Sequence, residues 1–267
     1  EHFQRPPTWL RVDRNADKSL HKQLMEDGAE WAGEASPCAY AFENAGKSSR
    51  WIQSQSEFLE IQDLSSQQVV RICEPTSGQK WWDACCGNGG KSLQLLDEAD
   101  RNLDLTCTDR REEVLRELTK RGRRHGLSKV RRYALDLLKK DLTLPNIKFD
   151  GILLDAPCSG TGTWSRNPDA PWRTEASDIP QGGRRQLAML QATSPAVATG
   201  GCIVFAVCSL CKTETVDVVS SFLESTPEIS LQPFVHPLTG EETDGTVTFL
   251  PSETKADGMF VAKFTKK

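Results

Sequence analysis

The chain has 267 residues, of which 37% are hydrophobic and 26% charged, with a formal net charge of −4. This length predicts one sizeable α/β domain with a small appendage, in a protein of ordinary globular composition. No apolar run is long enough to cross a membrane, and residues 1–6 lack the apolar core of a signal peptide. The net charge does not by itself indicate a nucleic-acid partner.

The nine cysteines are an odd number without the spacing of a small disulfide scaffold. We therefore expect reduced thiols in a cytoplasmic protein. Cys208 and Cys211 form a C-x-x-C pair, which is a spacing that zinc ligands use. No second pair has such a spacing and only four histidines are present, so no metal site is predicted.

Residues 1–60 show no steady hydrophobic periodicity and contain the pair Pro6-Pro7. We interpret them as a small N-terminal subdomain followed by a connection. Residues 61–267 are assigned to one main domain. No internal repeat or low-complexity tract is visible.

From about Gln79, strand and helix patterns alternate. These patterns predict strands at 80–85, 103–108, 130–135, 149–154 and 202–207, and helices at 91–99, 112–125, 181–198 and 213–225. Two later strand-like runs, at 246–250 and 259–264, have the pattern of a hairpin. The expected fold is α/β, with a doubly wound, seven-stranded, mostly parallel sheet and helices on both faces. In such sheets ligands bind beyond the carboxyl ends of the strands.

A glycine-rich turn joins the first of these strands to the following helix, in the residues Asp83, Ala84, Cys85, Cys86, Gly87, Asn88, Gly89, Gly90, Lys91 and Ser92. Glycines let the backbone approach a ligand closely, and a helix N-terminus favours a negative group such as a carboxylate. The alternative is a plain tight turn. The spacing is not that of a Walker phosphate-binding loop.

Two further acids follow the next strands. Asp109 ends the second strand, about twenty residues beyond the glycine-rich turn, where a carboxylate can accept both ribose hydroxyls of a nucleoside. Asp136 follows the third strand, where it can meet the edge of an adenine ring. Taken singly, each is more often a cap or turn residue. The ordered series of strand-terminal acids favours a nucleoside site.

Two cysteines also follow strands. Cys158 lies in the turn 155–163 after the fourth strand, and Cys208 directly follows the fifth. Free cysteines are usually small buried hydrophobes. Adjacent parallel strands, however, would bring both thiols to one rim of the sheet.

The segment from Arg110 to Arg132 has a local excess of Lys and Arg. It is either a solvated helix face or a surface that faces RNA, and the pattern alone leaves both readings open.

The run Asp155-Ala156-Pro157-Cys158-Ser159-Gly160-x-Gly162, with Arg166, Pro168 and Trp172 behind it, resembles a motif of the Nop/Sun family of RNA 5-methylcytosine methyltransferases. Similar matches to that family are found in Cys208-Ser209-Leu210, in the glycine-rich turn, and in the stretches 6–12, 62–67 and 257–262. The resemblance therefore extends over nearly the whole chain. It implies a Rossmann-like fold that binds S-adenosylmethionine, with RNA, and ribosomal RNA in the first place, as substrate.

The resemblance also implies a role for each site residue. Cys208 is the nucleophile that adds to carbon 6 of cytosine, so that carbon 5 can take the methyl group. Cys158 is implied in product release, and Asp155 in hydrogen bonding to the base. Asp155 is also expected at the cofactor, together with the residues of the glycine-rich turn, Asp109 and Asp136. Lys91 is a candidate for stabilising the Cys208 thiolate, because a free cysteine has a pKa of about 8.5.

Three alternatives remain. One is a transfer-RNA substrate, and another is a non-catalytic protein that binds the cofactor and RNA in an assembly role. The third is a methyltransferase for another substrate, such as DNA, protein or a small molecule. Cytosine-5 DNA enzymes place their nucleophile in the Pro-Cys turn, and that pattern would make Cys158 the nucleophile. We expect a monomer.

Overall fold

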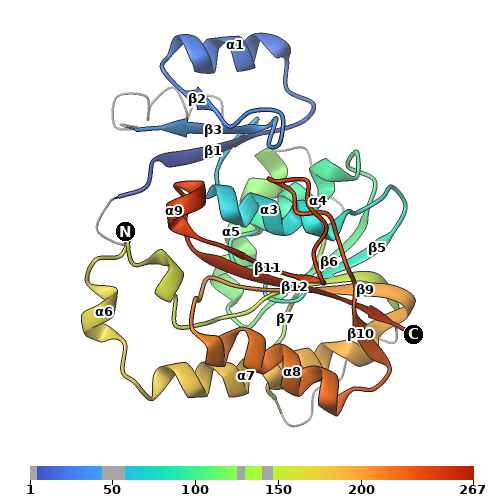
Figure 1. Ribbon diagram of the computed structural model, residues 1–267. Helices are drawn as coiled ribbons and strands as arrows, with labels where there is room; N and C mark the ends of the chain where they lie inside the picture. Colours follow the sequence, from blue (N-terminus) through green and yellow to red (C-terminus); the bar gives the residue numbers. More distant parts are fainter. Residues whose placement is uncertain (1–4, 44–57, 125–129, 140–146) are drawn as a thin grey trace.

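The computed structural model describes residues 5–43, 58–124, 130–139 and 147–267. The expected fold is confirmed: a mostly parallel sheet is covered on both faces by helices, and a small antiparallel sheet lies beside it (Figure 1). None of the helices in these ranges is long and apolar enough to span a membrane.

The N-terminal sheet has the strand order β2-β3-β1-β4, and every pair in it is antiparallel. Its strands are β1 (Thr8–Val12), β2 (Glu30–Trp31), β3 (Ala39–Phe42) and β4 (Leu59–Ile61). Helix α1 (Lys18–Glu26) begins where the Asp17 side chain accepts the backbone N–H of Ser19, and it packs Leu20 and Leu24 against the sheet. Sequence periodicity missed these elements because the strands are only two to five residues long.

The main sheet has the strand order β10-β12-β9-β8-β5-β6-β7, with β11 paired to β12. The parallel strands are β5 (Lys80–Asp83), β6 (Asp104–Asp109), β7 (Arg131–Ala134), β8 (Phe149–Asp155) and β9 (Val197–Val207). The antiparallel strands are β10 (Ile229–Leu231), β11 (Thr246–Phe249) and β12 (Met259–Lys266). The predicted hairpin-like pair is therefore present as β11 and β12, and β10 was not expected.

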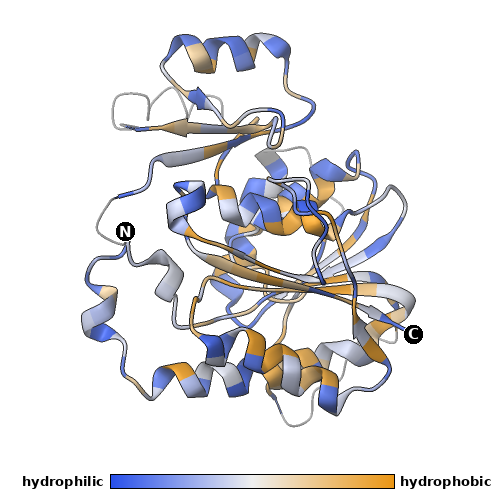
Figure 2. Ribbon diagram, in the orientation of Figure 1, coloured by the Kyte–Doolittle hydropathy of each residue, from blue (hydrophilic) through white to orange (hydrophobic). Residues whose placement is uncertain are grey.

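Apolar side chains of the strands face helices on both sides, so the interior of the sheet is the most hydrophobic part of the molecule (Figure 2). One face is covered by α3 (Leu64–Cys73), α4 (Gly90–Glu98) and α5 (Glu112–Arg124). The other is covered by α7 (Asp178–Thr193) and α8 (Val216–Ser225). Short helices α6 (Ala170–Arg173) and α9 (Pro251–Thr254) lie in connections.

Some element ends differ from the prediction. The helix expected to reach residue 198 ends at Thr193, because Pro195 interrupts it in the turn η2 (Ser194–Ala196) and Val197 already belongs to β9. The helix expected from 213 begins at Val216, after the turn η3 (Lys212–Glu214). His125, the expected end of α5, lies outside the described residues, as does part of the connection that was expected before residue 60.

A buried polar network joins β1 to α4. The side chain of Arg11 is 3% exposed, and its Nη1 lies 2.7 Å from Oδ2 of Asp97. Arg11 Nε also donates to Gln62 Oε1 over 2.9 Å, and Gln62 Nε2 donates to Gln94 Oε1 over 2.8 Å. The N-terminal sheet is therefore held against the main domain by a charge pair that water barely reaches.

We expect Asp97→Asn to lower the free energy of unfolding by about 3–5 kcal/mol, because it leaves the Arg11 guanidinium buried without a counter-charge. Burial raises the pKa of Asp97 to about 7, so urea unfolding at about pH 8.5, where the carboxylate is ionised, checks this. The matched control is Glu98→Gln, whose partner Arg14 is half exposed and whose loss should change stability by less than about 1 kcal/mol. Equal midpoints for the two variants would contradict the expectation.

Candidate active site

The two cysteines singled out in the sequence meet at the carboxyl edge of the sheet. Strands β8 and β9 run parallel with Asp155 opposite Ala206, so the chain leaves both strands at the same rim. Two residues after Ala206 and three after Asp155, the Sγ atoms of Cys208 and Cys158 lie 3.3 Å apart. Both side chains are partly buried.

Backbone hydrogen bonds hold the two loops together. Gly162 N–H donates to the carbonyl of Cys208 over 3.0 Å, and Gly258 N–H donates to the carbonyl of Gly162 over 2.8 Å. A Cβ atom on Gly162 would lie 2.1 Å from the Gly258 carbonyl oxygen, so the position accepts only glycine without rearrangement. The glycine of the Cys158 loop is thus required by the close approach of β12's leading segment.

Glu214 anchors the Cys158 loop from below. Its carboxylate is fully buried and accepts the backbone N–H of Ser159 over 2.9 Å and the Nε2 of Gln186 over 3.0 Å. The hydroxyl of Ser159 also donates to it. Glu214 was not predicted as a site residue. Its place in a short turn between the Cys208 loop and a helix was the only feature of the sequence that could have suggested it.

Asp155 and Lys91 form an ion pair beside the thiols. Lys91 lies in the first turn of α4, and its Nζ is 2.7 Å from Oδ2 of Asp155 at the end of β8. The Lys91 side chain is only 12% exposed. Burial lowers the pKa of Lys91, but the Asp155 carboxylate more than offsets this, so the net shift is upward and the ammonium stays charged.

The pKa values of the two thiols are shifted in opposite directions. The hydrogen bond with Cys158 lowers the pKa of Cys208. Burial and the carboxylates of Asp155 and Asp257 raise this pKa, whereas the Lys91 ammonium lowers it. The same hydrogen bond, together with burial, raises the pKa of Cys158. Cys208 is therefore the thiol that ionises first.

The glycine-rich turn lies at the same rim. Gly89 has a φ of 84° and precedes the first residue of α4. A Cβ atom there would lie 2.1 Å from Cδ1 of Leu118 in α5. Both the left-handed backbone and this approach to α5 favour glycine. The turn therefore exposes backbone rather than side chains at the helix N-terminus.

Asp83 enters the turn with one free oxygen. Its Oδ2 accepts the Ser92 hydroxyl over 2.6 Å, whereas Oδ1 is buried and has no hydrogen-bond partner within the described ranges. Burial raises the pKa of this carboxyl to about 7. Asp83 was predicted to lie in the turn but without a role. It ends β5 as Asp109 ends β6, and this shared position could have suggested a role at the site.

Asp109 contacts the turn directly. Its Oδ2 accepts the N–H of Gly87 over 3.1 Å, and Arg111 Nε donates to Oδ1 over 3.0 Å. Arg111 Nη2 also donates to Oδ2, over 3.1 Å. Burial on its own raises the pKa of Asp109, but these hydrogen bonds bring it below its usual value. A ligand that binds Asp109 must therefore share its oxygens with Arg111 or displace it.

The remaining predicted cofactor residues differ in exposure. Asp136 follows β7, is exposed, and accepts the N–H of Leu138 over 3.0 Å, which is a turn-forming contact. The Cys85 thiol has a raised pKa because it is buried, and that of Cys86 is raised by a hydrogen bond to Cys107 and by burial. These two thiols are therefore protonated.

Basic residues of the segment 110–132 partly face the protein. Arg121 on α5 donates to the carbonyl of Asn88 in the turn over 2.6 Å and pairs with Glu60 of β4. Arg111, whose side chain is half exposed, hydrogen-bonds Asp109 beside the same turn. The two interpretations left open by the sequence, a solvated helix face and a surface that faces RNA, therefore do not apply to the segment as a whole.

Arg166, behind the Cys158 loop, has a supporting role. Its Nη2 lies 2.9 Å from Oδ2 of Asp63, which caps α3, and its Nε lies 3.0 Å from Oδ1 of Asp257, which precedes β12. Nη2 also donates to the carbonyl of Pro7 over 3.0 Å. One guanidinium thus connects three of the segments that carried the family resemblance.

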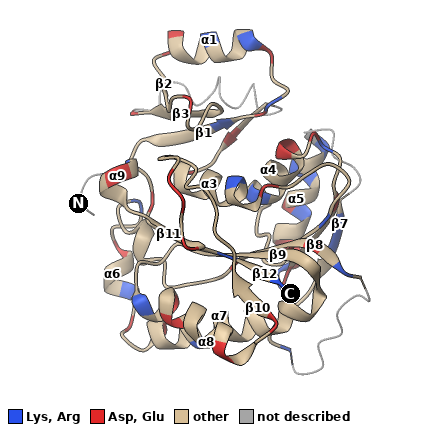
Figure 3. Ribbon diagram, turned by 45° about the vertical axis from the view of Figure 1, so that its right-hand side comes forward, with Lys and Arg blue, Asp and Glu red and all other residues tan. Residues whose placement is uncertain are grey.

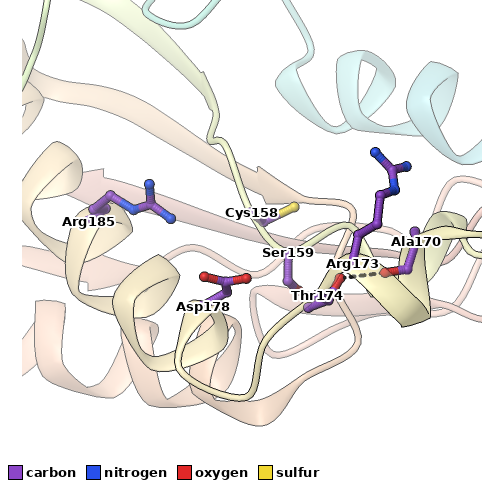
Figure 4. Close-up of a pocket in the computed structure, with 7 residues that line it drawn as sticks. All are labelled: Cys158, Ser159, Ala170, Arg173, Thr174, Asp178 and Arg185. Atoms are coloured by element: carbon purple, nitrogen blue, oxygen red, sulfur yellow. Dashed lines mark hydrogen bonds between the residues drawn. The ribbon is translucent and has the colours of Figure 1, made fainter.

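A cavity of about 320 Å³ opens beside Cys158. Figure 4 shows Arg185 and Asp178 on one side of Cys158 and Arg173 on the other. The residues that line this cavity come from the Cys158 loop, α6 and the first half of α7: Cys158, Ser159, Ala170, Arg173, Thr174, Asp178 and Arg185. Within the part of the chain that the structure describes, no group of three or more His, Cys, Asp or Glu side chains is arranged to hold a metal ion.

Comparison with known proteins gives a consistent picture. Residues 70–265 match the family model described as 16S rRNA methyltransferase RsmB/F. Ribosomal RNA small subunit methyltransferase B of Pasteurella multocida is 30% identical over 98% of this chain and 59% of its own length. The protein of that name from Citrobacter koseri is 31% identical over 99% and 61%. The chain thus spans about three fifths of the length of these relatives.

Among solved structures, NSun6 from Pyrococcus horikoshii with SFG superposes with a TM-score of 0.81 at 16% identity. The match covers 99% of this chain and 92% of that one. At this identity the similarity supports the fold alone.

We expect the rate of Cys208 alkylation by iodoacetamide to rise at a lower pH in the wild type than in Cys158→Ala, because removing the Cys158 hydrogen bond raises the pKa of Cys208. Peptide-resolved mass spectrometry over a pH series measures this. Cys211→Ala is the control, since the Cys211 thiol contacts Thr161 and not Cys208. A shift to lower pH in Cys158→Ala would refute the assignment.

Proposed function

Because this chain belongs to the 16S rRNA methyltransferase RsmB/F family, we propose that it transfers a methyl group from S-adenosylmethionine to carbon 5 of a cytosine in RNA. The observation that carries the proposal is the pair of thiols 3.3 Å apart, one with a lowered and one with a raised pKa. The relatives named above favour ribosomal RNA as the substrate, with transfer RNA as the alternative.

Cys208 acts as the nucleophile. Its thiolate forms a bond to carbon 6 of the cytosine, which makes carbon 5 electron-rich enough to take a methyl group. The proton on carbon 5 then leaves, and the bond from sulfur to carbon 6 breaks to release the thiolate. Lys91 supports the thiolate form before attack, as its effect on the Cys208 pKa indicates.

Cys158 and Asp155 assist this cycle. Cys158 is protonated while it lies against the free Cys208 thiol. In the proposal, once Cys208 is bonded to carbon 6, Cys158 loses its proton to water, and its thiolate then takes the proton from carbon 5 during release of the product. Asp155, held by Lys91, has a carboxylate that can hydrogen-bond cytosine at N3 or N4 and stabilise the adduct. The target base must leave its stack to reach these groups.

The glycine-rich turn and the strand-terminal acids suit S-adenosylmethionine. When bound, the cofactor supplies a methyl group on a sulfonium, which is electrophilic enough for carbon 5. In the proposal the residues 85–91, together with Asp109, Asp136 and Asp155, hold it. The free oxygen of Asp83 and the glycine backbone at the start of α4 are features that fit a ligand with an ammonium and a carboxylate.

The proposal divides the chain into a small RNA-binding subdomain, residues 1–60, and a catalytic domain, residues 61–267. The antiparallel sheet with α1 supports the first, although β4 runs on to Ile61. A cytoplasmic monomer acting on accessible RNA completes the proposal.

We expect Cys208→Ala to abolish transfer of tritium from labelled S-adenosylmethionine to RNA, and Cys158→Ala to accumulate a covalent RNA–protein adduct on denaturing gels, because release then lacks its proton-transferring partner. Cys202→Ala, a change in β9 away from the rim, is the control and should transfer methyl groups. Adduct formation by Cys208→Ala, together with its loss in Cys158→Ala, would reverse the assignment.

Bisulfite sequencing of RNA from cells with and without the gene identifies the cytosine.

We expect Asp109→Ala to weaken S-adenosylmethionine binding by about tenfold to hundredfold, because hydrogen bonds to a charged group contribute about 1.5–3 kcal/mol. Isothermal titration calorimetry measures the dissociation constant. Asp150→Ala is the control, since Asp150 lies at the opposite edge of the sheet, where it accepts the N–H of Lys80. Unchanged affinity in Asp109→Ala would remove Asp109 from the cofactor site.

A further inference from the structure

Trp172 lies on α6 with its side chain 89% exposed, more than any other large apolar side chain in the described ranges. Its neighbours on the same helix, Ala170 and Arg173, line the cavity beside Cys158. An indole with so much of its surface in water is unusual, because aromatic side chains of this size normally bury most of their surface.

The charged side chains at this cavity are mixed in sign but favour an anion. Arg173 and Arg185 line it, opposed by Asp178. Arg173 pairs with Asp169 over 2.8 Å, but both side chains are about two thirds exposed, so the pair is easily exchanged. Arg185 is exposed and has no ion-pair or hydrogen-bond partner among the residues that the structure describes. Helix α6 ends in the basic residue Arg173, and α7 begins with the acidic Asp178 and then carries Arg184 and Arg185 (Figure 3).

We propose that Trp172 stacks on the base next to the target cytosine, and that Arg185 and Arg173 bind the phosphates that connect the two nucleotides. This rests on the proposed function. A base that reaches Cys208 has left its stack, so its neighbour exposes a π-face, and exposed aromatic side chains with nearby arginines are how proteins hold single-stranded RNA. Ala170 and Arg173 of the same short helix line the Cys158 cavity, and this favours RNA over a protein segment as the occupant.

A fluorescence titration tests the stacking itself. A cytosine-containing single-stranded RNA pentamer should quench part of the tryptophan emission of the wild type, and this part should be absent in Trp172→Phe. Trp172→Ala should weaken binding of the labelled pentamer, measured by anisotropy, by about tenfold to hundredfold, whereas Trp172→Phe keeps a ring and should retain most of the affinity. Identical quenching in the wild type and Trp172→Phe would overturn the proposal and leave a protein segment as the occupant.

A pair of arginine variants tests the phosphate contact. Arg184 and Arg185 are adjacent and exposed on α7, but only Arg185 lines the cavity. Arg185→Ala should reduce the slope of log affinity against log salt by about one, whereas Arg184→Ala, with the same loss of charge, should leave it unchanged. Equal slopes for the two variants would overturn this contact.

Methyl transfer to a 16S rRNA transcript separates this inference from the proposed function. Trp172→Ala should raise KM with little change in kcat, because stacking acts on binding and not on the reacting atoms. If the wild type transfers methyl groups and Trp172→Ala has an unchanged KM, the inference fails while the function stands. If the wild type transfers no methyl group while RNA quenches the indole, the proposed function fails and the binding site stands.

Discussion

The parallel pairing of β8 with β9 is the constraint on which the site depends. Because parallel strands end at one edge, the turn after Asp155 and the turn after Val207 share a rim, and two thiols fifty residues apart in the chain lie 3.3 Å apart. An antiparallel pair would have placed them at opposite ends of the sheet. Both strands are central and buried, so their register is set by the packed core on either face.

Around this pair, buried charges are placed so that each has a partner. Glu214 receives the Ser159 and Gln186 donors, Lys91 meets Asp155, and Arg166 meets two carboxylates. A buried carboxylate without such donors would be costly, so these contacts restrict the loops to one arrangement. The apolar core under the loops contributes the stability that offsets the entropy lost when they are ordered. The difference between the pKa values of the two thiols follows from the same arrangement.

The outer parts of the molecule have different tasks. The N-terminal sheet is joined to α4 by Arg11 and Asp97, and to the Cys158 loop through the contact of Arg166 with Pro7. Movement of that sheet would therefore disturb both α4, which follows the glycine-rich turn, and the Cys158 loop. Trp172 contributes nothing comparable to the core, which is why its exposure points to a partner outside the chain.

The sequence by itself determined the layered fold and the positions of its chemistry. Short apolar runs for the buried strands, amphipathic patterns for the helices, and glycines and acids at strand ends are local signals, so β5 to β9, the glycine-rich turn and the two cysteines were all predicted. The short N-terminal strands, the support from Glu214, the free oxygen of Asp83 and the contact of Arg111 with Asp109 were not. Strands of a few residues leave too little periodicity to detect. Contacts between segments tens of residues apart depend on how whole elements pack, which only the tertiary structure decides.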